Sequence, residues 1–389
     1  MTMGEFRAGL AEAAGAMRPA EAKGAPALDM PRHNERRCAS HSGSRGNFAA
    51  LDLGTNNCRL LIARRLPVGD ADDGHGDFQV IDAFSRIVRL GEGLIQTGRL
   101  SEAAMDRTLV ALSACADKLA RRGVTQVRSV ATEACRRAEN GPEFVRRVYA
   151  ETGLALDVIT PAEEARLAVL GCQTLIDRKA RRTLVFDIGG GSTEVVLLER
   201  VNGNRQRDRA HGRDGRGPGF RMQAWVSVPW GVVSLGESEV LDAGTPVRRL
   251  EAYARMKARV AGHLEPVRQL MQGEVQLLGA SGTVTTLASL NMGLPQYDRR
   301  KVDGSLAATS ELVALSHDLA VKSPGERALI PGVGSDRADL VVAGAAILEA
   351  LIDLGAAPML RVADRGIREG ILRSMIGRDD SHRANRASL

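Results

Sequence analysis

The chain has 389 residues, enough for two or three domains, and its 44% hydrophobic and 26% charged residues are typical of a globular protein. Aromatic residues make up only 3%, so we expect an aliphatic core and no nucleic-acid interface built from stacked rings. The net charge of +6 comes from residues 1–46 (+2), 202–221 (+4) and 378–389 (+1), which leaves the remainder at −1. The basic balance therefore argues against a specific nucleic-acid partner.

The cysteine and hydropathy patterns indicate the cellular compartment. The five cysteines are odd in number and form no C-x-x-C pair, which disfavours a disulfide framework or a zinc site and predicts a reducing, cytoplasmic location. No run of 18 apolar residues occurs, so we expect no membrane partner.

In chain order, residues 1–46 lack periodicity and are predicted to be a disordered N-terminal extension. The body then alternates strand and helix patterns, which indicates an α/β protein. The predicted strands are 48–53, 58–64, 127–131, 183–188, 194–198 and 275–278. The predicted helices are 101–122, 160–176, 246–271 and 341–354.

Two polar segments interrupt or follow this body. Residues 202–221 are rich in glycine and arginine, and we interpret them as a disordered basic insert. The alternative is an arm that attracts polyanions. Residues 378–389 are predicted to be a disordered tail.

An internal repeat is the most informative feature. LDLGTNNCRLLIARR, from Leu51, aligns without a gap with FDIGGGSTEVVLLER, from Phe186, at an offset of 135 residues. Asp52 then matches Asp187, and Arg59 matches Glu194. Two strand–turn–strand copies predict two related domains that face each other.

The second copy has the composition of a phosphate-binding turn. Three glycines allow the backbone N–H groups to approach an anion, and two hydroxyls add donors. Asp187 and Glu194 are candidate ligands of Mg²⁺, which prefers oxygen. An ordinary hairpin turn is the alternative. The candidate phosphate-binding residues are Gly189, Gly190, Gly191, Ser192 and Thr193.

Two further turns are weaker candidates of the same kind. Gly54, Thr55 and Asn56 follow Asp52, a third candidate metal ligand. Ser281, Gly282 and Thr283 follow a predicted strand and open a helix, whose free N–H groups can bind an anion. A plain turn is the alternative in both cases.

Carboxylates and arginines complete the candidate set. Thr160, Pro161 and Glu163 form a capping-box pattern, which assigns Glu163 to the helix start and leaves Glu164 without a structural role beyond the helix dipole. Arg59, Arg136 and Arg368 stand beside small-residue turns. Guanidinium groups suit phosphate, although a solvated surface role is the ordinary expectation for a lone arginine.

The ordered motifs resemble those of the exopolyphosphatase/guanosine pentaphosphate phosphohydrolase family, within the sugar kinase–Hsp70–actin superfamily. The resemblance extends from about residue 48 to 376. The matching segments are DLGTNNCRL at Asp52, RLGEGL at Arg89, VATEACRRA at Val130, AEEARL at Ala162, DIGGGSTE at Asp187, GASGTVTTL at Gly279, RADLVVAGAAIL at Arg337 and ADRGIREGIL at Ala363.

This resemblance implies two actin-like (ribonuclease H-like) domains with an interdomain cleft. We expect domain I at 47–160, joined by a C-terminal helix at about 367–377, and domain II at 161–366. Glu164 falls where the family places the carboxylate that orients or deprotonates the attacking water. Asp187 falls on the metal-associated aspartate, and Arg136 and Arg368 fall on arginines thought to hold polyphosphate.

The implied activity is Mg²⁺-dependent release of terminal orthophosphate from inorganic polyphosphate, with Mn²⁺ as an alternative metal. Guanosine pentaphosphate is a second candidate substrate, and a homodimer is compatible with this assignment. Two other readings stay open. One is a small-molecule kinase of the same superfamily, and the other is a non-catalytic sensor of guanosine polyphosphate or polyphosphate.

Overall fold

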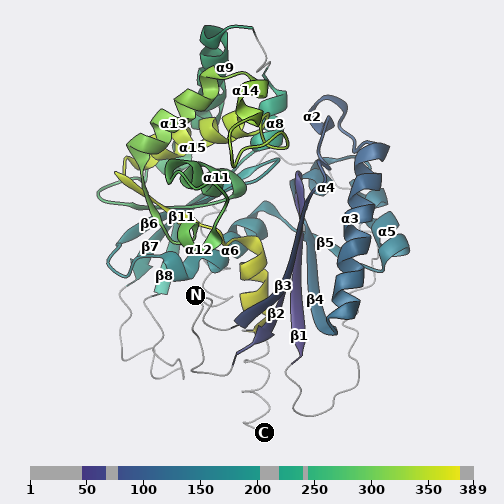
Figure 1. Cartoon of the computed structure of the whole chain (residues 1–389). Helices are drawn as coiled ribbons and strands as arrows, with labels where there is room; N and C mark the ends of the chain where they lie inside the picture. Colours follow the sequence, from purple (N-terminus) through teal and green to yellow (C-terminus); the bar gives the residue numbers. More distant parts are fainter. Residues whose placement is uncertain (1–45, 67–77, 202–218, 240–243, 377–389) are drawn as a thin grey trace, which may run out of the picture.

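The computed structural model describes residues 46–66, 78–201, 219–239 and 244–376 (Figure 1). The disorder expected for 1–45, 202–218 and 378–389 therefore lies outside the described residues. Residues 219–221, which we expected to belong to the insert, instead begin a strand and pair with its neighbour. The insert prediction was wrong at this end because the strand's backbone hydrogen bonds outweigh the polar local composition.

The first half of the body contains a five-stranded sheet, sheet A, in the order β3-β2-β1-β4-β5. Its strands are β1 (Asn47–Leu53), β2 (Asn57–Arg65), β3 (Phe78–Ile87), β4 (Val124–Ala131) and β5 (Leu156–Val158). The helices in this half are α2 (Leu94–Thr97), α3 (Glu102–Arg121), α4 (Glu133–Arg137) and α5 (Gly141–Thr152).

The second half contains a six-stranded sheet, sheet B, in the order β10-β11-β9-β6-β7-β8. Its strands are β6 (Arg182–Ile188), β7 (Thr193–Val201), β8 (Gly219–Val228), β9 (Gln276–Ala280), β10 (Leu306–Ala308) and β11 (Met359–Ala363). The helices are α6 (Pro161–Cys172), α8 (Val232–Glu237), α9 (Pro246–His263), α10 (Glu265–Arg268), α11 (Gly282–Asn291), α12 (Arg299–Val302), α13 (Thr309–Val321), α14 (Pro324–Ala328) and α15 (Val341–Gly355). A 3₁₀ turn, Gln173–Leu175, follows α6.

The two sheets repeat one topology, as the sequence repeat predicts. In each, three antiparallel strands come first, and two later strands then extend the sheet in parallel from the first one, β4 and β5 in sheet A and β9 and β11 in sheet B. Sheet B has one more strand, β10, which pairs antiparallel with β11 at its edge. Asp52 pairs with Arg59 across the β1–β2 hairpin, and Asp187 pairs with Glu194 across the β6–β7 hairpin. The 135-residue offset thus holds in strand register, and the expected α/β fold with two actin-like domains is confirmed.

Apolar side chains cover both faces of each sheet. On one face of sheet A, Leu51 and Leu60 pack against Leu112 of α3 and Phe144 of α5. The outer face of sheet B packs against α9, α11, α13 and α15, whose residues include the fully buried Leu351. The opposite, inner face of each sheet is turned toward the other half of the molecule (Figure 1).

Helix α6 lies between the two sheets. Leu167 and Ala168 pack with sheet A, whereas Ala165 and Val169 pack with sheet B. Residues 367–376 are helical and also pack against sheet A. The domain boundaries at 160 and 366 stay a prediction.

The helix ends follow local capping chemistry. The Ser101 hydroxyl accepts the Ala104 N–H at the start of α3, and Gly123, with φ of 57°, follows the helix. The single helix that we expected over 246–271 is wrong. It divides at Leu264 because Pro266 has no N–H to continue the ladder. No helix within the described ranges is long and apolar enough to cross a membrane.

Candidate functional site

A cavity of 620 Å³ lies where the β1–β2 turn, the β6–β7 turn, α6 and α11 meet. Fifteen of the eighteen candidate residues line it, and Arg136, Thr193 and Arg368 do not. The lining candidates are Asp52, Gly54, Thr55, Asn56, Arg59, Glu164, Asp187, Gly189, Gly190, Gly191, Ser192, Glu194, Ser281, Gly282 and Thr283.

The carbonyls of both hairpin turns are occupied from outside. The N–H groups of Val88 and Arg89 donate to Asn56 O at 2.8 and 3.0 Å. In the other half, the N–H groups of Val232 and Val233 donate to Gly189 O and Gly190 O at 2.9 and 2.8 Å. Within the described residues, no acceptor faces the N–H groups of four turn residues, namely Thr55, Asn56, Gly190 and Gly191. Such clustered, free N–H groups form an anion-binding surface.

Close packing explains why the second turn is built from glycine. A Cβ atom on Gly190 would lie 2.9 Å from Thr55 Cβ and 3.0 Å from the Asn56 N. A Cβ on Gly231, the N-cap residue of α8, would lie 2.4 Å from the carbonyl carbon of Gly190. The two turns therefore touch, and any larger residue at Gly190 would separate them.

Three side-chain oxygens of the first hairpin are buried without a hydrogen-bond partner among the described residues. They are Asp52 Oδ1, Thr55 Oγ1 and Asn56 Oδ1. An unsatisfied buried polar atom costs about 1–3 kcal/mol. All three residues line the cavity, so a polar ligand there would remove this cost.

Four carboxylates, those of Asp52, Glu164, Asp187 and Glu194, line the same cavity. Burial raises the pKa of Asp187 to about 7, with Arg59 opposing it. Burial and the charge of Asp187 raise the pKa of Glu194 to about 7. Burial also raises the pKa of Asp52. This crowding of negative charge is an environment that favours a cation.

Glu164 occupies the first turn of α6, where the Thr160 hydroxyl accepts the Glu163 N–H and begins the helix. Burial, followed by the charge of Glu194, raises the pKa of Glu164 well above its usual range. Its Oε2 accepts from Arg136 Nη1 and Nη2 at 3.3 and 3.2 Å. Its Oε1 forms no hydrogen bond within the described part of the chain, which leaves that oxygen for a water molecule.

Arg136, which we expected to bind phosphate, is engaged entirely by protein groups. Besides Glu164, it donates to Glu133 Oε2 from Nε at 3.0 Å and from Nη2 at 2.6 Å. Its Nη1 also donates to the Ile159 carbonyl at 2.6 Å. A fork engaged in this way fixes the Glu164 side chain.

The remaining candidates differ in their surroundings. Arg59 lines the cavity, and its Nη2 lies 3.6 Å from the position that a Cβ on Gly282 would take. The charge of Arg368 acts on Asp52 and Asp187, although Arg368 does not line the cavity. The Thr193 hydroxyl donates to the Trp230 carbonyl at 2.8 Å and so supports the turn.

Two cavity arginines were missed as site candidates. Arg86 extends from β3, and Arg337 precedes α15, where its Nη1 donates to Thr286 Oγ1 at 2.9 Å. Arg86 stands in no small-residue turn, so local sequence gives no signal for it. Arg337 begins the RADLVVAGAAIL match, and that position could have identified it.

The capping box that we expected at Glu163 is only half formed. Its carboxylate accepts from Arg166 at 2.7 and 2.8 Å and from Arg128 at 3.0 Å, and does not reach back to Thr160. The prediction failed because ion pairs with two guanidinium groups are stronger than one bond to a backbone N–H.

The donor set fits a magnesium ion that keeps most of its waters. Asp52, Asp187 and Glu194 supply carboxylate oxygens, and Asp52 Oδ1 lacks a partner. In the described residues, no three His, Cys, Asp or Glu side chains converge tightly enough to hold a metal alone. This agrees with the usual Mg²⁺ site, in which one or two carboxylates act with waters and substrate phosphates.

Known proteins match this chain over most of its length. Residues 68–379 match the Ppx/GppA phosphatase family. Exopolyphosphatase 2 of Mycobacterium tuberculosis (strain H37Rv) is 31% identical over 340 residues, which cover 85% of this chain and 98% of that protein.

Solved structures agree. The crystal structure of the Aquifex aeolicus member of the Ppx/GppA family matches with a TM-score of 0.66 and 29% identity, over 86% of this chain and 98% of that one. An exopolyphosphatase from Cytophaga hutchinsonii matches with a TM-score of 0.70 and 26% identity, over 85% and 98%. By its sequence and its paired hairpin topology alike, the chain belongs to the Ppx/GppA phosphatase family.

Proposed function

We propose that the protein releases terminal orthophosphate from inorganic polyphosphate by direct attack of water. The observation that carries this proposal is one cavity holding free N–H groups from two hairpin turns and the unpaired Oε1 of Glu164. The named activities of the relatives, both exopolyphosphatases, point to the same substrate. The cavity volume falls in the range of small-molecule sites.

Binding rests on the two turns and the cations around them. The N–H groups of Thr55, Asn56, Gly190 and Gly191 are suited to hold the terminal phosphate. The first turn of α11 adds free N–H groups at Gly282 and Thr283. We propose that the cavity arginines Arg59, Arg86 and Arg337 offset the negative charge of the polyphosphate chain.

Glu164 has the position and environment of a general base. Its raised pKa increases its affinity for the proton of an attacking water, while Arg136 holds its other oxygen. Water forms the new P–O bond at the terminal phosphorus, the bridging P–O bond breaks, and the shortened chain leaves. The water proton goes to Glu164.

Asp187, Glu194 and Asp52 are the residues that we propose hold Mg²⁺ or Mn²⁺, mainly through water. A divalent ion bound there would offset charge on the transferring phosphoryl group and its leaving oxygen. The difference between the two copies of the repeat supports a metal site at the second hairpin. In the first hairpin Asp52 faces Arg59, whereas in the second Asp187 faces Glu194 and both are acidic.

Phosphate release separates this proposal from its rivals. We expect Mg²⁺-dependent release of orthophosphate from polyphosphate without any acceptor, and guanosine pentaphosphate is the second substrate to test. A kinase of the same superfamily would require an acceptor hydroxyl, and a sensor would bind polyphosphate or guanosine polyphosphate without turnover. Either result would overturn the proposal.

A further inference from the structure

We infer that Glu237 is a positioning residue, which fixes the sheet-A turn against the sheet-B turn by accepting a hydrogen bond from the Gly93 N–H. Its kinetic consequence rests on the proposed function, whereas the contact itself does not. Glu237 ends α8 in the sheet-B half, and Gly93 precedes α2 in the sheet-A half. Figure 1 shows α8 and α2 next to each other in the upper part of the molecule, below α9.

The contact between the halves is well defined. Gly93 N donates to Glu237 Oε1 at 2.9 Å. With its amide nitrogen turned toward these acceptors, Gln96 donates to Glu237 Oε2 and to Gly93 O, both at 3.2 Å. Gly93 has a φ of 73°, a left-handed conformation that suits glycine. Both oxygens of one half-buried carboxylate are thus used on the opposite half.

The segment before Gly93 holds the first hairpin turn. The N–H groups of Val88 and Arg89 donate to Asn56 O, and the Gly91 N–H donates to Thr55 O at 2.9 Å. A Cβ on Gly91 would lie 2.3 Å from Thr55 Cγ2, so this segment lies directly against the turn. Whatever fixes Gly93 therefore also fixes the turn.

Helix α8 holds the second turn in the same manner. Besides the bonds from Val232 and Val233, the Ser234 hydroxyl accepts the Gly231 N–H at 2.8 Å and donates to Gly191 O at 3.2 Å. The Gly93–Glu237 bond closes a ring that runs from one turn, through segment 88–93 and α8, to the other turn. Because Gly190 touches Thr55 and Asn56 on the inside, the ring sets the spacing of the two sets of N–H donors.

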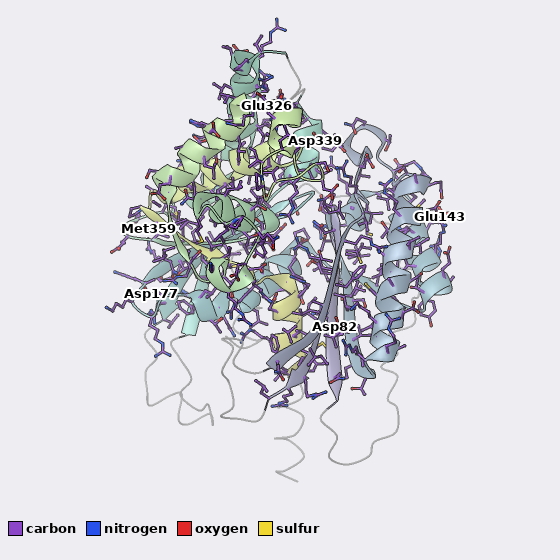
Figure 2. All side chains as sticks on the ribbon, viewed as in Figure 1. Asp82, Glu143, Asp177, Glu326, Asp339 and Met359 are labelled. Carbon is purple, nitrogen blue, oxygen red and sulfur yellow. The ribbon has the colours of Figure 1, made fainter. Side chains whose placement is uncertain are left out.

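Glu239 provides a matched control two residues away. Glu237 and Glu239 line the same 330 Å³ side cavity, along with Asp339, which is labelled in Figure 2. Glu239 accepts from Arg255 at 3.0 and 3.1 Å and from Arg259 at 2.8 Å, both on α9 of its own half. Removing it costs the same charge and comparable bonds without touching sheet A.

The experiment compares Glu237→Ala, Glu237→Gln and Glu239→Ala in the full chain. Hydrogen exchange is followed by mass spectrometry on peptides covering 88–98, together with kcat and KM on polyphosphate. Losing a hydrogen bond to a charged group corresponds to roughly 10- to 100-fold faster exchange at Gly93. We expect this for Glu237→Ala alone, with a fall in kcat/KM. Glu237→Gln, whose amide oxygen can still accept, should recover most of both.

Unchanged exchange at 88–98 in Glu237→Ala would overturn the inference, as would an equal increase in Glu239→Ala. Faster exchange that Glu237→Gln fails to reduce would also count against it. If the wild-type protein releases no phosphate, the proposed function fails, and the exchange data still decide whether Glu237 holds the two halves together.

Discussion

Two neighbouring glutamates at the start of α6 should separate stability from turnover. The Glu163 carboxylate accepts three bonds from Arg166 and Arg128, whereas Glu164 lines the cavity. We therefore expect Glu163→Ala to lower the free energy of unfolding and leave kcat close to wild type. We expect Glu164→Gln to leave the free energy of unfolding close to wild type and to lower kcat.

The structure sets the magnitudes. Arg166 is buried, with 8% of its side chain exposed, so Glu163→Ala removes two hydrogen bonds to a guanidinium group that water reaches poorly. A hydrogen bond to a charged group contributes about 1.5–3 kcal/mol, and we expect Glu163→Ala to cost about 2–3 kcal/mol. Loss of general-base assistance lowers rate by about 10²–10⁴-fold, which we expect for Glu164→Gln.

The expected effect of Glu164→Gln on stability follows from the pKa of Glu164. Because burial raises the pKa of Glu164, the folded state disfavours its charged form. Gln resembles the neutral form, so Glu164→Gln should not lose stability beyond the weakened Arg136 contact. Urea unfolding and steady-state phosphate release measure the two effects. An inactive Glu163→Ala with a fully active Glu164→Gln would refute the assignment of the catalytic carboxylate.

Three further predictions concern the charged groups. Asp187→Asn should abolish Mg²⁺-dependent turnover in steady-state assays while circular dichroism shows a folded protein. Arg136→Lys should lower kcat by about 10²-fold at nearly constant KM, because a misplaced Glu164 affects the chemical step; a raised KM at constant kcat would instead show that Arg136 binds the chain. Burial raises the pKa of Asp187 and Glu194 to about 7, so the stability that they contribute to the metal-free protein is present at pH 4 and lost as pH rises through 7. Mg²⁺ should therefore raise the melting temperature more at pH 8 than at pH 5, and an equal effect at both would contradict this.

The repeat explains why the sequence predicted the core of the site well. A gapless offset of 135 residues specified both hairpins, and the strand registers at Asp52–Arg59 and Asp187–Glu194 follow it. Residues that act through local backbone chemistry, such as Gly190 in its turn, are visible in a short window of sequence. The amino-acid sequence alone is therefore enough to locate these parts of the cavity.

Side-chain partners were harder to predict because they depend on distant segments. Arg136 donates to Glu164, 28 residues away, and Arg128 pairs with Glu163 across 35 residues. Arg86 enters the cavity only because β3 lies beside β2, a pairing that no local pattern shows. Strand β8 was not among the predicted strands, and its first residues share the polar composition of the preceding segment.

Hydrolysis in ¹⁸O-labelled water tests the central claim most directly. If water attacks the terminal phosphorus of polyphosphate, each orthophosphate released in the first turnover carries one ¹⁸O atom from solvent. Mass spectrometry of that orthophosphate should show this label in the presence of Mg²⁺ and no acceptor. Release of unlabelled orthophosphate would place the attack elsewhere on the chain, and transfer of phosphate to an acceptor would show that the protein is not a hydrolase.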